Sequence, residues 1–246
     1  MKPKSKTLHD GERVDEAAKE SFPASDAPSF NGGARTPDAA KSPYVVRKEL
    51  KPKGLAGIGE EQIAQHWTLY EGYVKNTNLL TDKLTVLTRA KDFGPEFAEL
   101  KRRLGFEYDG MILHELYFES LKSGEKPLGD FAELTKLMKR FFGGFESWKA
   151  EFTAIGKMRG VGWTILYFDP SRGVLSNQWV TLHQDGHPAG FLPLLVMDVW
   201  EHAYMVDAGV DGRAGYIEAF LKNVDWPLIE TRLARAKRLT QDTGVK

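Results

Sequence analysis

The sequence predicts an α+β fold, in which a long N-terminal helical hairpin is followed by an α/β domain with a small three-stranded antiparallel sheet. Apolar residues recur every three or four positions between residues 59 and 123, which is the period of an amphipathic helix. β-rich runs replace this pattern between residues 162 and 199, and the helical period returns after residue 213. This order of helices, strands and helices is typical of α+β proteins.

We divide the chain into an N-terminal extension (1–48), a helical-hairpin domain (49–125) and a C-terminal α/β domain (126–246). Residues 1–44 contain five of the twelve prolines, a single leucine, and no isoleucine or tryptophan. Such a segment cannot bury enough apolar surface to offset the entropy of ordering it, so we expect disorder apart from a short helix near residues 14–21. The segment SGEKPLGD (123–130) is expected to link the two domains, because it is rich in glycine and proline.

Two long helices are expected in the hairpin. The first begins near Gly59 and carries an apolar stripe from Ile63 to Leu80, about five turns long. The second runs from Pro95 to about residue 123. Gly105 and Gly110 are expected to interrupt it, because glycine is a poor helix former.

The α/β domain is expected to begin with two shorter helices, residues 131–141 and 145–158, separated by a glycine pair. The runs at 162–169 and 174–182 predict a β-hairpin around the turn Asp169-Pro-Ser-Arg-Gly173. The run at 192–199 is continuously apolar, as is typical of a buried strand. Helical patterns at 213–223 and 226–239 complete the domain.

Composition excludes several classes of function. The 246 residues include 34 Lys and Arg and 34 Asp and Glu, and this zero net charge argues against nucleic-acid or membrane-surface binding. No apolar run approaches the roughly 18–20 residues needed to cross a bilayer. The absence of cysteine excludes disulfides, thiolate metal sites and a cysteine nucleophile. The first residues, MKPKSKTLHDGERVDE, lack the apolar segment of a secretory signal, so we expect a cytoplasmic protein.

Without cysteine, metal or acid–base chemistry must come from histidine, aspartate and glutamate. His66 and His114 each lie on the apolar stripe of a long helix, where a buried ring needs a partner; a hydrogen-bonded core histidine is the alternative for each. Asp198 and His202 emerge at the end of the third strand. Together the four side chains predict a mononuclear metal site with three imidazoles and one carboxylate. Fe, Mn and Zn all suit it, and hydrolysis by a metal-bound water stays open.

The segment Asp198-Val-Trp-Glu-His-Ala-Tyr204 resembles the D-x-W-E-H-A-Y signature of the iron/manganese superoxide dismutases. The resemblance extends over about residues 59–235, and four further segments carry it: Met111–Phe118, Gly160–Thr164, Arg213–Ile217 and Asn223–Trp226. It implies that His66, His114, Asp198 and His202 are the metal ligands. It also implies a helical hairpin followed by an α/β domain, in agreement with the periodicity.

The implied activity is that of an antioxidant oxidoreductase, which converts the superoxide anion to dioxygen and hydrogen peroxide with one Mn or Fe ion per subunit. The resemblance implies a homodimer or homotetramer. Glu201 resembles the residue that crosses the two-fold interface to hydrogen-bond the partner's ligand. Tyr73 resembles the family's gateway tyrosine and Trp163 the aromatic residue that lines the pocket, with ordinary core packing as the alternative for both.

The choice of metal depends on two positions. Iron-type members carry a glutamine four residues before the second histidine, where this chain has Gly110. Manganese-type members supply a glutamine after the sheet hairpin, and Gln184 falls in that region, so Gly110 with Gln184 favours manganese. His183 or His187 takes the role of Gln184 if the register is shifted; otherwise these two are expected to be solvated loop histidines.

The chain departs from the family pattern near the substrate gateway and the dimer interface. His66 and Tyr73 are seven residues apart rather than eight, which still places them about 20° apart on one helix face. Met205 replaces a tyrosine that normally pairs across the dimer. The second hypothesis is therefore a metal-binding relative of the superoxide dismutases with little or no dismutase activity, and a metal-dependent hydrolase is the third.

Overall fold

The computed structural model describes residues 43–124, 127–129 and 132–242. Most of the predicted extension, including the short helix expected near residues 14–21, lies outside these residues. Residues 43–48, which we placed in the extension, are described and lie against the first long helix. There the backbone N–H of Tyr44 donates to Asn78 Oδ1 (3.2 Å) and that of Arg47 to the Tyr70 hydroxyl (3.0 Å).

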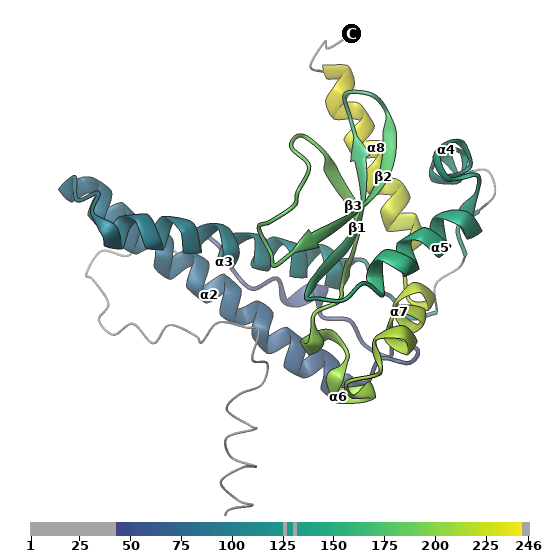
Figure 1. Cartoon of the computed structure of the whole chain (residues 1–246), viewed down its shortest axis with the longest axis horizontal. Helices are drawn as coiled ribbons and strands as arrows, with labels where there is room; N and C mark the ends of the chain where they lie inside the picture. Colours follow the sequence, from purple (N-terminus) through teal and green to yellow (C-terminus); the bar gives the residue numbers. More distant parts are fainter. Residues whose placement is uncertain (1–42, 125–126, 130–131, 243–246) are drawn as a thin grey trace, which may run out of the picture. The chain divides into compact units, whose positions relative to one another are not determined.

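The two long helices form the predicted hairpin, α2 (Glu60–Ala90) and α3 (Pro95–Glu119), which lie side by side (Figure 1). A short 3-10 turn, η1 (Lys48–Leu50), precedes them. α2 continues ten residues beyond the predicted stripe, although Leu84 is its only buried residue after Leu80. Leu84 and Leu87 continue the apolar spacing, but most residues of the last turns are exposed, so the helix extends past the end of the buried stripe.

The expected interruption of the second helix is wrong, because α3 is continuous through both glycines. A glycine inside a helix costs about 0.5–1 kcal/mol relative to alanine, which tertiary packing can offset. Gly110 is buried, and a Cβ added there would lie 2.8 Å from Cδ1 of Tyr73 on α2. The missing side chain therefore lets a ring from α2 approach the backbone of α3.

The three predicted strands are confirmed as β1 (Gly162–Asp169), β2 (Val174–Thr181) and β3 (Leu192–Asp198), two of them ending one residue sooner than expected. They form an antiparallel sheet in the order β2-β1-β3. Every residue of β1, the central strand, is buried. Trp163 of β1 pairs with Asp198 of β3, so the start of β1 lies beside the end of β3.

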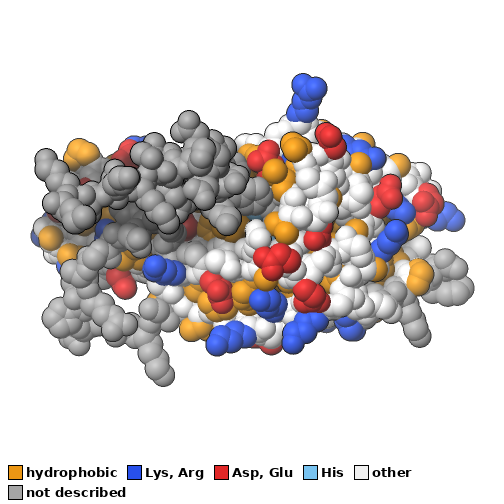
Figure 2. Space-filling view, turned by 90° about the horizontal axis from the view of Figure 1, so that it is seen from below, with side chains coloured by type: hydrophobic (Ala, Val, Ile, Leu, Met, Phe, Trp, Pro, Cys, Tyr) orange, Lys and Arg blue, Asp and Glu red, His pale blue; other side chains and the backbone are white. Residues whose placement is uncertain are grey.

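The remaining helices surround the sheet (Figure 1). α5 (Phe145–Gly156) contacts β1 and β2, whereas α3 contacts β3 together with α8 (Trp226–Asp242). The other elements are α4 (Glu133–Phe142), η2 (Glu201–Ala203), α6 (Met205–Ala208) and α7 (Arg213–Lys222). Within the described residues, no helix is both long enough and apolar enough to span a membrane. Basic and acidic side chains are interspersed on the face shown in Figure 2, in line with the zero net charge.

Candidate metal centre

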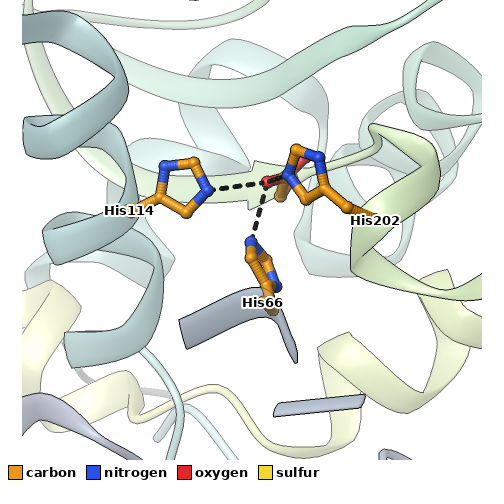
Figure 3. Close-up of side chains that lie close together, drawn as sticks. His66, His114 and His202 are labelled. Carbon is orange, nitrogen blue, oxygen red and sulfur yellow. Dashed lines mark hydrogen bonds and ion pairs between the residues drawn. The ribbon is translucent and has the colours of Figure 1, made fainter. Parts of the chain in front are cut away.

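The four predicted ligands come from four different elements and meet where the helical hairpin contacts the end of the sheet. His66 lies on α2, His114 on α3, Asp198 at the last position of β3, and His202 in η2. All four side chains are buried, and their ligand atoms lie within 4.8 Å of one another. The rings of His66, His114 and His202 point toward a common centre (Figure 3).

Local structure aims the carboxylate and the third imidazole at this centre. Oδ1 of Asp198 accepts a hydrogen bond from the backbone N–H of Trp200 (2.8 Å), which leaves Oδ2 facing the rings. The 3-10 turn η2 follows at once and returns His202 toward Asp198. Buried Gln62 on α2 secures this turn, since its amide donates to the His202 carbonyl and accepts from the Val206 N–H. Gln62 was not among the predicted site residues, although a glutamine in an apolar stripe, four residues before His66, indicates a buried polar contact.

Three imidazoles converge on one carboxylate oxygen. Oδ2 of Asp198 lies 2.9 Å from His202 Nε2, 3.1 Å from His66 Nε2 and 3.7 Å from His114 Nε2. Hydrogen bonds alone do not explain this arrangement, because the 3.7 Å between His114 Nε2 and Oδ2 is beyond hydrogen-bond range. A metal ion held by all four side chains would explain it, because ligand bonds of about 2.0–2.2 Å bring the ligand atoms close together.

The hydrogen bond of His114 shows which of its ring nitrogens faces the centre. Its Nδ1 lies 2.6 Å from the Gly110 carbonyl, and a carbonyl only accepts, so Nδ1 carries the proton. Nε2 therefore presents its lone pair to the centre, where it is buried with no hydrogen-bond partner among the described residues. Burial lowers the pKa of His114 well below its ordinary value, and the neighbouring His66 lowers it further. The ring is thus held in the neutral form that binds metals.

The carboxylate is held in its charged form. Burial by itself would raise the pKa of Asp198, but the adjacent His202 and His66 lower it by more, and the net pKa lies below the ordinary value. An ionised carboxylate beside three imidazoles suits Fe, Mn or Zn. The residues present therefore fit the metal that the sequence predicts.

Two of the predicted catalytic residues lie beside the ligands. The ring centroid of Tyr73 lies 5.0 Å from that of His114, and the Trp163 centroid lies 5.1 Å from it. Both aromatic side chains are buried. The spacing of seven residues between His66 and Tyr73 therefore still brings the phenol to the site.

His183 lies between these two aromatic residues, whereas Gln184 does not. Trp163 Nε1–H donates to His183 Nδ1 (3.1 Å), and His183 Nε2 lies 2.8 Å from the Tyr73 hydroxyl. The ring of His183 is 5.9 Å from that of His114, centroid to centroid. Gln184 is only half-buried, and its Cβ faces Gly105 of α3. His183, an alternative that the sequence left open, is therefore the side chain that contacts both Trp163 and Tyr73.

The backbone explains why His183 rather than its neighbour points inward. β2 ends at Thr181, and Leu182 has φ 50°, in the left-handed region that non-glycine residues rarely adopt. This turn breaks the alternation of the strand and directs the His183 ring toward α3. Glu201, the remaining predicted site residue, is half-buried at the start of η2. Its role across an interface stays a prediction.

Known proteins with similar sequences are superoxide dismutases. The family model of the iron/manganese superoxide dismutases, C-terminal domain, matches residues 130–232. The chain is 40% identical over 201 residues to the superoxide dismutase (Fe) of Cupriavidus metallidurans, covering 77% of this chain and 98% of that protein. It is 36% identical to the superoxide dismutase (Fe) of Aquifex pyrophilus, covering 78% and 92%. It is 32% identical to the superoxide dismutase (Mn/Fe) of Aeropyrum pernix, covering 80% and 86%.

Proposed function

The chain belongs to the iron/manganese superoxide dismutase family, and we propose that it disproportionates superoxide at one Mn or Fe ion bound by His66, His114, Asp198 and His202. The observation that carries this proposal is the convergence of three imidazole nitrogens and one carboxylate oxygen in a buried centre, with ligand atoms within 4.8 Å of one another. One superoxide gives up an electron and leaves as dioxygen. A second takes up that electron and two protons and leaves as hydrogen peroxide.

A bound ion of either metal supplies the one-electron chemistry, and the residues around it supply orientation and protons. An indole N–H only donates, so His183 Nδ1 must accept the hydrogen bond from Trp163. The proton of the neutral His183 ring therefore lies on Nε2. His183 Nε2–H then donates to the Tyr73 oxygen. The hydroxyl proton of Tyr73 is thereby directed away from His183. We propose that this proton faces the substrate and is one of the two delivered to the forming peroxide.

We leave the metal as Mn or Fe. The expectation of manganese rested on Gly110 together with Gln184, and the side chain that meets Tyr73 and Trp163 is His183 instead. The similar proteins carry names with Fe and with Mn/Fe. The cytoplasmic location expected from the sequence belongs to the same proposal, and fractionation of cells tests it.

The proposal is tested by counting metals and turnover in the same sample. Protein purified without added metal is expected to contain Mn or Fe, and superoxide dismutation per chain is expected to rise in proportion to that content. Elemental analysis and a superoxide-consumption assay provide the two numbers. A site filled with Mn or Fe that shows negligible turnover would favour the metal-binding relative, and a site that functions only with zinc would favour the hydrolase.

We further propose that the active form is a homodimer or homotetramer in which Glu201 reaches the partner subunit's His202. The position of Glu201 supports this, because it is half-buried directly beside a ligand. Glu201→Ala is expected to lower the oligomer mass measured by light scattering and to lower turnover per metal. Glu218→Ala, at an exposed position of α7, is the matched control and should change neither. An unchanged mass and turnover in the Glu201 variant would contradict the bridging role.

A further inference from the structure

A second histidine, His187, is hydrogen-bonded to the backbone of His183. His187 Nε2 lies 2.7 Å from the His183 carbonyl oxygen, and Nδ1 lies 2.6 Å from the Tyr167 hydroxyl. Because a carbonyl only accepts, Nε2 carries the proton and Nδ1 accepts from the tyrosine. Both ring nitrogens of His187 are therefore engaged, and the orientation of its ring is set.

The segment between these histidines needs such support. Leu182 adopts a backbone conformation that is unfavourable for a residue with a Cβ, and it directly precedes His183. One backbone bridge closes the turn, with Thr181 N–H donating to the Asp185 carbonyl (2.9 Å) and Asp185 N–H to that of Thr181 (3.3 Å). This bridge holds residues 181 and 185, while the carbonyl of His183 at the tip of the turn is held by His187.

Two side chains of strand β1 thus hold His183 in place. Trp163 and Tyr167 are four residues apart, so they lie on the same face of the strand. Trp163 holds the ring of His183 directly, and Tyr167 holds its carbonyl through His187. Burial raises the pKa of Tyr167, which keeps its hydroxyl protonated as a donor. Asp109 of α3 is the acidic group that interacts electrostatically with His187, and burial raises its pKa.

We infer that His187, supported by Tyr167, is a positioning residue that fixes the backbone at His183 and so determines how the His183 ring meets Tyr73. This inference rests on the proposed function, because it assigns His187 an effect only through His183. It adds two residues, neither of them in contact with the four ligands, to the set that controls the reaction.

The experiment is a double-mutant cycle of His187→Ala and His183→Ala in the full-length, metal-loaded protein. His187→Ala is expected to leave the metal content unchanged, to lower turnover per metal on the order of 10-fold and to shift the visible absorption of the oxidised metal. In the His183→Ala background the same change is expected to alter neither turnover nor spectrum. Thermal melting of all four proteins monitors folding.

Conservative variants separate positioning from general stability. His187→Gln keeps an N–H donor for the His183 carbonyl and is expected to recover most of the lost turnover and the original spectrum. Tyr167→Phe removes only the support of His187 and should have a smaller effect than His187→Ala. Equal losses from His187→Ala in both backgrounds, with parallel drops in melting temperature, would overturn the inference in favour of a structural role. A wild-type protein that binds Mn or Fe but has no turnover would instead refute the proposed function, and the spectra would still test the positioning.

Discussion

His114→Ala is expected to abolish metal retention and dismutation together. The ring of His114 presents a buried lone pair to the centre, and no other described side chain is placed to replace it. Loss of a residue that merely supports a ligand lowers metal affinity about 10–100-fold, so loss of a ligand is expected to lower it by more than about 100-fold. Elemental analysis after dialysis measures the retained Mn and Fe, and the superoxide assay measures the accompanying loss of turnover.

Two controls make this result specific. His114→Leu fills most of the volume of the imidazole without a ligand nitrogen, so it separates loss of the ligand from the cavity that alanine leaves. His183→Ala removes a buried imidazole from the same neighbourhood, and it is expected to retain the metal while lowering turnover. Retention of a full complement of Mn or Fe by both His114 variants would show that His114 is not a ligand.

Gly110→Ala is expected to lower turnover per metal on the order of 10–100-fold while the metal stays bound. The added Cβ would lie 2.8 Å from Tyr73 Cδ1, 2.9 Å from Tyr73 Cε1 and 3.1 Å from His183 Cδ2. Separations under 3 Å between carbon atoms are repulsive, so the phenol or the helix must move. The crowded groups are Tyr73, whose proton we propose is delivered, and His183, which orients Tyr73, whereas no ligand atom is among the three nearest to the added Cβ. Turnover, metal content and the visible spectrum together measure the effect.

Gly105→Ala on the same helix is the matched control. A Cβ there meets only Gln184 Cβ, at 3.8 Å, which is an ordinary contact. This change is expected to leave turnover unaltered and to raise the free energy of unfolding by about 0.5–1 kcal/mol, as measured by denaturant titration. Equal turnover in the two alanine variants would contradict the role proposed for the space at Gly110.

The sequence by itself determined the ligands and the order of the elements. His66 and His114 stand out because a helix of 3.6 residues per turn places them on an apolar stripe, where an imidazole needs a partner. Asp198 and His202 stand out because a carboxylate and an imidazole directly follow a buried strand. These signals are local in the chain, so periodicity and composition are enough to predict them. The same holds for the strands, whose boundaries differ from the predicted ones by at most one residue.

Only the tertiary structure decided which side chain meets Tyr73 and Trp163. Neighbouring residues at the end of a strand point in opposite directions, so a single unusual backbone angle at Leu182 selects His183 over Gln184. That angle is a property of the folded loop, held by Thr181, Asp185 and His187, and no residue preference predicts it for leucine. The continuity of α3 through Gly110 has a similar cause, because packing against Tyr73 outweighs a weak local preference.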